Sequence, residues 1–264
     1  MDLGLKNKVV IISGASQGLG YASALSFARE GAKIAICSRK KDRIELAAAK
    51  IKAEIPSADI LALPADVTET HSIQQFVNQV IEKWGTVHVC ITNTGGPPSI
   101  QFMEAGDEVW QQSFNLTLMS AVRLSRAVVP LMQKQQWGRI IHICSASVKN
   151  PIPNLLMSNA IRSAVVAMSK TQSNELAADN ILVNCLLPGW TDTERVNEIM
   201  GAKAKYQQIS LEEAYAMRKN MIPLKRMGKP EEIANSVVFL ASEPASFITG
   251  TTLTVDGGET RVPF

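Results

Sequence analysis

Seven short apolar runs, rich in β-branched residues and separated by segments of helical period, constrain the fold of this chain most. Parallel strands need long crossover connections, and strands covered on both faces read as nearly continuous apolar runs. The pattern therefore predicts an α/β fold with a doubly wound, seven-stranded parallel sheet. The expected strands are VVIIS (9–13), KIAIC (33–37), DILAL (59–63), HVCIT (88–92), RIIHIC (139–144), ILVNCLL (181–187) and TTLTV (251–255).

The intervening segments show the 3.6-residue apolar period of helices, except in one place. Residues 190–227 break the alternation with scattered methionines and tyrosines among polar residues. This insert predicts one or two helices that form a small lid over the carboxyl ends of the strands, where doubly wound sheets bind ligands. We expect residues 1–264 to form a single domain. Helices are expected near 18–30, 42–54, 69–83, 107–135, 154–178 and 230–241.

Charge and cysteine usage exclude several functions. The 27 basic and 24 acidic residues are scattered, which argues against nucleic-acid binding. No signal peptide and no apolar run of about 18 residues is visible, so we expect a cytoplasmic protein without a membrane span. The cysteines show neither CxxC nor Cys/His spacing, which predicts buried free thiols and no metal site. They are Cys37, Cys90, Cys144 and Cys185.

A glycine-rich stretch, SGASQGLG, follows the first expected strand and opens the first expected helix. Glycines there allow a tight turn and a close approach to a pyrophosphate, whose charge the N–H groups at the helix start favour. The position of the glycines favours dinucleotide binding over a plain structural turn. The predicted cofactor contacts in this stretch are Gly14, Ser16, Gln17, Gly18, Leu19 and Gly20.

The residues at the end of the second strand, ICSRKKDR, indicate whether NAD or NADP binds. An acidic residue here would bind the ribose hydroxyls of NAD, whereas an arginine suits the additional phosphate of NADP. This chain has Ser38 and Arg39, followed by Lys40 and Lys41, which predicts NADP(H) over NAD(H). The alternative is that these are solvated charges at a helix start, and Gln17 brings no second positive charge to the glycine loop.

These features, with further motifs in the same order, resemble the short-chain dehydrogenase/reductase family and its 3-ketoacyl-(acyl-carrier-protein) reductase-like branch. The resemblance runs from about Lys8 to Gly258 through ADV (65–67), NTGG (93–96), FNLTLMSAVRLSRAVVPLM, GRIIHICSAS, VNCLLPGWTDT and ITGTTLTVDGG. It implies a single Rossmann-type oxidoreductase domain that acts on a small carbonyl or alcohol compound and forms a homotetramer or homodimer. The further cofactor contacts that it implies are Asp66 and Val67 beside the adenine, and Asn93, Thr94, Gly95, Pro188, Gly189, Thr191 and Thr193.

The family's catalytic residues are an asparagine, a serine and the tyrosine and lysine of a YxxxK motif. Asn115 matches the first, and Ser145 matches the second, with Ser147 as a near competitor. The tyrosine is expected thirteen residues after the serine and the lysine four residues later. Those positions hold Ser158 and Arg162. The resemblance therefore predicts a catalytic set of Asn115, Ser145, Ser158 and Arg162, with Arg162 also at the cofactor.

A shift in alignment does not restore the motif. The chain has three tyrosines, Tyr21, Tyr206 and Tyr215, and none follows the fifth strand. The downstream MSKTQSNELA also falls at the family spacing. YAMRK, from Tyr215 to Lys219, fits YxxxK in letters, but it lies in the lid insert, and we interpret it as a coincidence.

The altered pair leaves three hypotheses for the chemistry. A serine hydroxyl is far more basic than a phenol, whose pKa is about 10, and an arginine stays protonated. In the first hypothesis the protein is a reductase: Arg162 and Ser145, with Ser158, orient the carbonyl, and water supplies the proton. In the second, Tyr206 or Tyr215 swings in from the lid as the acid. In the third, the protein binds NADP without redox activity, as a sensor or an oligomeric partner.

Structural explanations of the pair also stay open. Ser158 is compatible with a small packing residue of its helix, and Arg162 with an ion pair to Glu175 or to an acidic residue of a partner subunit. The substrate is not identified by the sequence. The apolar lid and the loop GGPPSIQFM (95–103) suggest a medium-sized, partly apolar carbonyl compound.

Overall fold

The computed structural model describes residues 1–262, which contain a seven-stranded sheet of order β3-β2-β1-β4-β5-β6-β7. Every neighbouring pair is parallel, so the predicted fold class is confirmed. The strand order reverses between β1 and β4, and doubly wound sheets bind ligands at this switch point. The strands are β1 (Val9–Ser13), β2 (Lys33–Ser38), β3 (Ile60–Pro64), β4 (Val89–Thr92), β5 (Gly138–Ile143), β6 (Ile181–Pro188) and β7 (Thr252–Val255).

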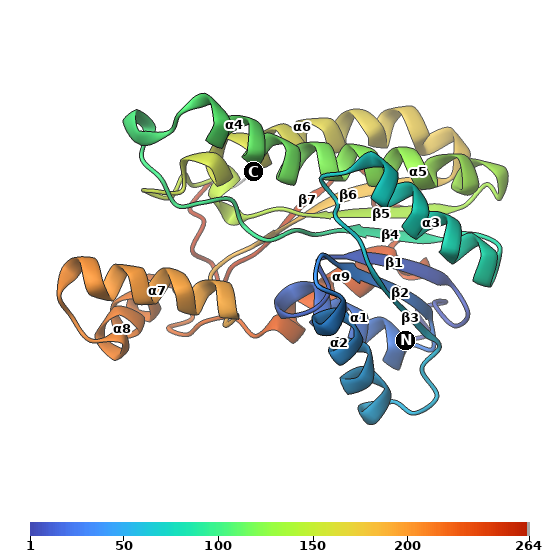
Figure 1. Cartoon of the computed structure of the whole chain (residues 1–264), viewed down its shortest axis with the longest axis horizontal. Coiled ribbons are helices and arrows are strands. Elements are labelled where there is room, and N and C mark those ends of the chain that lie inside the picture. Colours follow the sequence, from blue (N-terminus) through green and yellow to red (C-terminus); the bar gives the residue numbers. More distant parts are fainter. Residues whose placement is uncertain (263–264) are drawn as a thin grey trace.

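Helices cover both faces of the sheet (Figure 1). Helices α1, α2 and α9 lie on one face, and α3, α4, α5 and α6 lie on the other. The lid insert contains α7 and α8, which project to one side of the sheet, as the sequence predicted for one or two helices. The helices are α1 (Gly18–Arg29), α2 (Lys41–Glu54), α3 (Thr70–Trp84), α4 (Asp107–Phe114), α5 (Ser120–Lys134), α6 (Leu156–Leu176), α7 (Glu194–Gln207), α8 (Leu211–Met221) and α9 (Pro230–Ala241).

The central strands are buried on both faces because successive side chains point to opposite sides of the sheet. In β1, Val10 and Ile12 pack into the apolar core beneath α1 and α9. Val9 and Ile11 belong to the core on the other side, with residues of α3 and α5. Burial on both sides explains why these strands read as continuous apolar runs.

The cysteines of the chain lie in the interior of the protein. All four cysteines, at 37, 90, 144 and 185, are free and buried. Residues 1–262 contain no group of three or more His, Cys, Asp or Glu side chains arranged to hold a metal ion. In the same part of the chain, no helix has the length and apolar character needed to cross a membrane.

The helix expected over 107–135 contains a π-helical turn. After α4, the segment Asn115–Met119 is π-helical, and α5 begins only at Ser120. The Ser120 hydroxyl donates to the backbone carbonyl oxygen of Leu116, four residues earlier in the helix, at 2.6 Å. Wide turns of this kind occur frequently at functional sites. The helical backbone continues through this turn to Lys134, so the expected long helix is confirmed, and the apolar period gives no sign of the π-helical turn.

Candidate functional site

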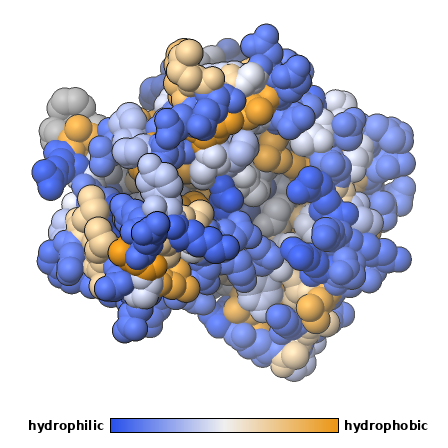
Figure 2. Space-filling view, turned by 60° about the vertical axis from the view of Figure 1, so that its left-hand side comes forward, coloured by the Kyte–Doolittle hydropathy of each residue, from blue (hydrophilic) through white to orange (hydrophobic). Residues whose placement is uncertain are grey.

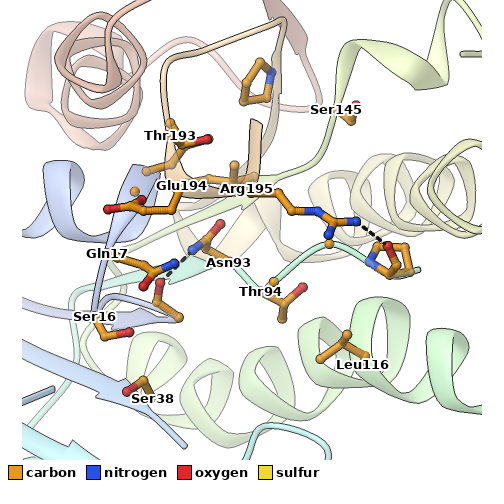
Figure 3. A pocket seen from close by; sticks show the side chains of 18 of the residues that line it. Ser16, Gln17, Ser38, Asn93, Thr94, Leu116, Ser145, Thr193, Glu194 and Arg195 are labelled. Atoms are coloured by element: carbon orange, nitrogen blue, oxygen red, sulfur yellow. Dashed lines mark hydrogen bonds between the residues drawn. The ribbon is translucent and has the colours of Figure 1, made fainter. Parts of the chain in front are cut away.

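A cavity of about 700 Å³ opens at the carboxyl ends of the strands. Figure 2 shows this side of the molecule, where much of the surface is hydrophilic, and Figure 3 shows side chains that line a pocket there. Every predicted cofactor residue lines the cavity except Gly20. Of the predicted catalytic residues, Ser145, Ser158 and Arg162 line it and Asn115 does not.

The backbone of the glycine loop depends on its glycines. Gly14 and Gly18 have φ angles of +59° and +57°, which non-glycine residues rarely adopt. A Cβ atom on Gly20 would lie 2.5 Å from the Gly14 carbonyl oxygen, so Gly20 allows α1 to approach the loop. The N-cap residue of α1, Gln17, makes no side-chain cap bond, which leaves first-turn N–H groups for an anion. This geometry fits a dinucleotide pyrophosphate.

Asn93, at the end of β4, holds the glycine loop in place. Its amide nitrogen Nδ2 donates to the carbonyl oxygen of Gly14 at 3.0 Å. Its backbone carbonyl accepts from the Ser13 hydroxyl at 2.8 Å. The two strands at the switch point are therefore tied together directly beneath the cavity.

Positive charge gathers at one end of the cavity. Arg39 and Lys40 line it, as does Arg43, which sequence reasoning did not select. All three are exposed, and within the described part of the chain none forms an ion pair. Lys41, in contrast, lies 3.8 Å from Glu45 and is absent from the cavity wall. Three unpaired cations suit a dianionic phosphate on the ribose.

The other end of the cavity carries the serines. Ser145 lines it, and its Oγ accepts a hydrogen bond from the backbone N–H of Ser147 at 3.1 Å, which leaves the Ser145 hydroxyl proton free to donate. Ser147 is buried away from the cavity, and its Oγ lies 3.3 Å from the Oγ of Ser158. Ser158 therefore contacts the cavity on one side and the Ser147 hydroxyl on the other.

Arg162 lies one helical turn beyond Ser158 and is 8% exposed. Its Nη1 donates to the carbonyl oxygen of Ile143, at the end of β5, at 3.0 Å. Burial lowers the pKa of the guanidinium, the nearby Cys144 thiol opposes that shift, and the positive charge of Arg195 adds to the lowering. Within residues 1–262, no carboxylate lies within ion-pair distance of Arg162, so the alternative of a pair with Glu175 is wrong.

Asn115 occupies the first position of the π-helical segment. Its side-chain oxygen accepts from Nη2 of Arg123 at 2.7 Å, and the next residue, Leu116, faces the cavity instead. The side chain thus stabilises the junction between α4 and α5 in this structure. Its catalytic role stays a prediction.

No phenol among the described residues lines the cavity. The Tyr206 side chain is 87% exposed on α7, and the Tyr215 hydroxyl donates to the side-chain oxygen of Asn197. Lys219 is exposed on α8 with its ammonium group 5.9 Å from the centre of the Tyr215 ring. The positions of Tyr206 and Tyr215 give no support to a lid tyrosine as proton donor. The YAMRK segment does not line the cavity.

Sequence reasoning missed two charged residues at the start of the lid. Glu194 and Arg195 open α7, and both line the cavity. Figure 3 shows Arg195 extending toward the loop after β4, where its Nη2 donates to the Pro97 carbonyl oxygen at 2.9 Å. Glu194 points the other way, and its Oε2 lies 3.7 Å from the position of a Cβ on Gly18. Charged residues in a polar helix look solvated in a sequence, so no local signal marks them.

A second cavity of about 120 Å³ adjoins the first. The two share Ser145 and Leu155, and two residues of the α7 face, Val196 and Ile199. Ile152 and Trp190 add further apolar wall to the smaller one. The pair forms a main cavity with a smaller side chamber beside Ser145.

A cavity at the switch point of a doubly wound parallel sheet, with a glycine loop at a helix N-terminus, defines a nucleotide-binding fold of the Rossmann type. A family model described as enoyl-(acyl carrier protein) reductase matches residues 14–260. The chain belongs to the short-chain dehydrogenase/reductase family, with a 3-oxoacyl-(acyl-carrier-protein) reductase-like relationship.

Three known proteins illustrate the relationship. The 3-oxoacyl-[acyl-carrier-protein] reductase FabG of Thermotoga maritima is 32% identical over 96% of this chain and 98% of its own. The L-sorbose reductase of Gluconobacter frateurii, solved with NADPH and L-sorbose, is 34% identical with a TM-score of 0.94, covering 99% of this chain and 100% of its own. A short-chain oxidoreductase of Pseudomonas aeruginosa, described as containing an atypical catalytic center, is 26% identical with a TM-score of 0.90, covering 98% and 99%.

Proposed function

We propose that this protein is an NADP(H)-dependent reductase that converts a small carbonyl compound to an alcohol without a tyrosine as proton donor. The observation that carries the proposal is the shape and charge of the main cavity. Unpaired cations stand at one end, the glycine loop lies at the helix start, and Ser145, Ser158 and Arg162 stand at the other end. Relatives and structural neighbours named as NADPH-dependent reductases support this assignment.

Different residues along the cavity would bind different parts of NADP(H). Arg39 and Arg43 would bind the ribose phosphate that distinguishes NADP from NAD. The first-turn N–H groups of α1 would bind the pyrophosphate. Arg162, fixed by its bond to the Ile143 carbonyl, would hold the nicotinamide ribose. When bound, the reduced dinucleotide supplies the hydride.

The chain's own groups then stabilise the charge that develops on the carbonyl oxygen. The Ser145 hydroxyl is free to donate to that oxygen because it accepts, rather than donates, in its bond to Ser147. The Arg162 guanidinium adds a permanent positive charge in a buried setting, where electrostatic stabilisation is strong. Water supplies the proton. Losing a positioned general acid typically costs about a hundred- to ten-thousandfold in rate, so we expect slow turnover.

Variants at Arg162 test the proposal. R162A is expected to weaken NADPH binding, measured by calorimetry, because it removes the cation at the ribose, whereas R162K is expected to retain it. NADPH oxidation with a panel of diketones and quinones then reports reductase activity. Failure of the native protein to bind NADPH or NADP⁺ would overturn the proposal, and unchanged binding in R162A would remove Arg162 from the cofactor site.

A second function, NADP binding without redox activity, has one observation in its favour. No phenol lines the cavity in the described residues, and neither a serine nor an arginine titrates near neutral pH. Tight NADPH binding together with no NADPH oxidation across the carbonyl panel would establish this sensor-like role in place of the reductase.

Three further properties belong to the proposal. The chain forms one dinucleotide-binding domain over 1–264, with 190–227 as its lid. It assembles as a homotetramer or a homodimer, and it acts in the cytoplasm. Light scattering of the purified protein, with and without NADPH, measures the assembly.

A further inference from the structure

The main cavity contains two arginines at the end that carries the serines, and their arrangement bears on the substrate. We propose that the carbonyl substrate is an oxo acid with an apolar chain, whose carboxylate binds Arg195, while Arg162, which would hold the nicotinamide ribose, adds positive charge to the same part of the cavity. This inference rests on the proposed reductase function and names its substrate class.

The two guanidinium groups reach the cavity from different elements. Arg162 comes from α6 and Arg195 from the first turn of α7, and both line the cavity. Each is fixed by a backbone carbonyl, Arg162 by Ile143 at 3.0 Å and Arg195 by Pro97 at 2.9 Å. An arginine has five N–H donors, so these anchors leave donors for a ligand on both residues. Planar guanidinium groups suit a carboxylate well.

No carboxylate of the cavity wall neutralises this pair. Glu194 points toward the glycine loop, away from the Arg195 guanidinium (Figure 3). Glu198 lies 3.3 Å from Nη1 of Arg195, but its side chain is 66% exposed, and such surface pairs contribute little. Glu259, in the wall of the side chamber, is paired with Arg218. Two like charges with no strong counter-charge favour an anionic ligand.

The serines and Arg162 lie in the same part of the cavity. Ser158 and Arg162 are four residues apart on α6, so they lie one turn apart on the same face of the helix. Oxo acids that keep the carbonyl within one or two carbon atoms of the carboxylate, the 2-oxo and 3-oxo acids, are the ones that we test.

The side chamber, the smaller of the two cavities, would hold the apolar chain of the substrate. It opens beside Ser145, and its wall includes Ile152, Leu155, Val196 and Ile199. With the carbonyl at Ser145 and the carboxylate in the main cavity, an aliphatic chain of the substrate extends into this chamber, where burial of apolar surface favours binding.

The reaction on such a substrate balances without a further reagent. The carbonyl carbon gains the hydride supplied by the reduced dinucleotide, and the C=O π pair moves to the oxygen, which takes a proton from water. The products are the hydroxy acid, the oxidised dinucleotide and hydroxide. Arg195 holds the carboxylate, which keeps its charge throughout.

The test uses the NADPH-saturated protein and N-propyloxamate, which carries a carboxylate beside an unreactive amide carbonyl. Calorimetry is expected to show binding of N-propyloxamate and at least about tenfold weaker binding of its methyl ester, because the ester lacks the charge. R195Q is expected to weaken N-propyloxamate binding by a similar factor, and R195K to restore part of it. K205Q is the matched control, since Lys205 is an exposed cation on α7 outside the cavity wall.

Turnover provides the second readout. 2-Oxohexanoate and 3-oxohexanoate are compared with the uncharged 2,3-heptanedione, and at least one of the acids is expected to have the higher kcat/KM in the native protein but not in R195Q. Equal binding of acid and ester, or an R195Q variant that loses NADPH affinity while keeping N-propyloxamate affinity, would overturn the inference and leave the reductase proposal standing. Absence of NADPH binding in the native protein would instead refute the reductase proposal.

Discussion

Replacing Gly20 with alanine tests how the glycine loop forms the cofactor site. The new Cβ would lie 2.5 Å from the Gly14 carbonyl oxygen and 2.9 Å from the Asn93 amide nitrogen. Ordinary contacts between heavy atoms lie near 3.5–4.0 Å, so the loop backbone must move. Overpacking of this kind costs about 1–3 kcal/mol. Because the displaced backbone is the part that faces the pyrophosphate, we expect NADPH affinity to fall as well.

The measurement combines urea unfolding with titration of NADPH fluorescence. G20A is expected to lower the free energy of unfolding by about 1–3 kcal/mol and to raise the Kd for NADPH at least about tenfold, which corresponds to 1.4 kcal/mol. The control is G201A on α7: a Cβ there meets nothing within 4 Å, and alanine favours a helix by roughly 0.5–1 kcal/mol. A G20A variant as stable as G201A, with native NADPH affinity, would refute this account of the loop.

Three further outcomes are expected. His142 is fully buried and burial lowers its pKa to about 4, so between pH 6.5 and pH 4 only the unfolded state takes up its proton, and urea unfolding is expected to show stability falling over this range. H142N is expected to remove only part of the fall, because the pKa of His88 is also lowered to about 4. Trp137 lies between Lys8, at 3.9 Å, and Arg139, at 4.2 Å, so W137A is expected to cost about 2–3 kcal/mol in thermal unfolding. The double variant S158Y/R162K is expected to raise turnover of a diketone, measured as NADPH oxidation, about a hundredfold or more if the missing acid limits the rate.

The elements that could be predicted are those whose signal is local. The central strands begin and end within a residue or two of the apolar runs, because a strand covered on both faces has no polar positions to interrupt it. The glycine loop was equally readable, since strand, glycines and helix are consecutive in the chain. The π-helical turn at Asn115–Met119 was not readable, because the apolar spacing of the sequence is unchanged through it.

The residues that line the main cavity were likewise only partly predictable from the sequence. Ser145, Ser158 and Arg162 were found because the family resemblance fixes their spacing, and the structure places all three on one wall. Arg43 and Arg195 were missed, since both look like ordinary surface cations, and their position depends on how a helix lies across the sheet edge. The Asn115 assignment came from the same resemblance, which does not report the bond to Arg123 that its side chain makes in place of lining the cavity.

The replacement of an amine by a guanidinium at position 162 has a structural consequence that extends beyond proton transfer. A guanidinium can bond to the Ile143 carbonyl at 3.0 Å and still present further donors to the cavity, because its five N–H groups are spread over a plane. Arg195 also lines the cavity, so the site holds two fixed positive charges, while the position of the family's titrating phenol holds the neutral hydroxyl of Ser158. Charge of this kind binds and orients an anion but supplies no proton. If the proposed function holds, we expect the site to select substrates by their charge, and turnover to depend on water reaching the carbonyl oxygen beside Ser145.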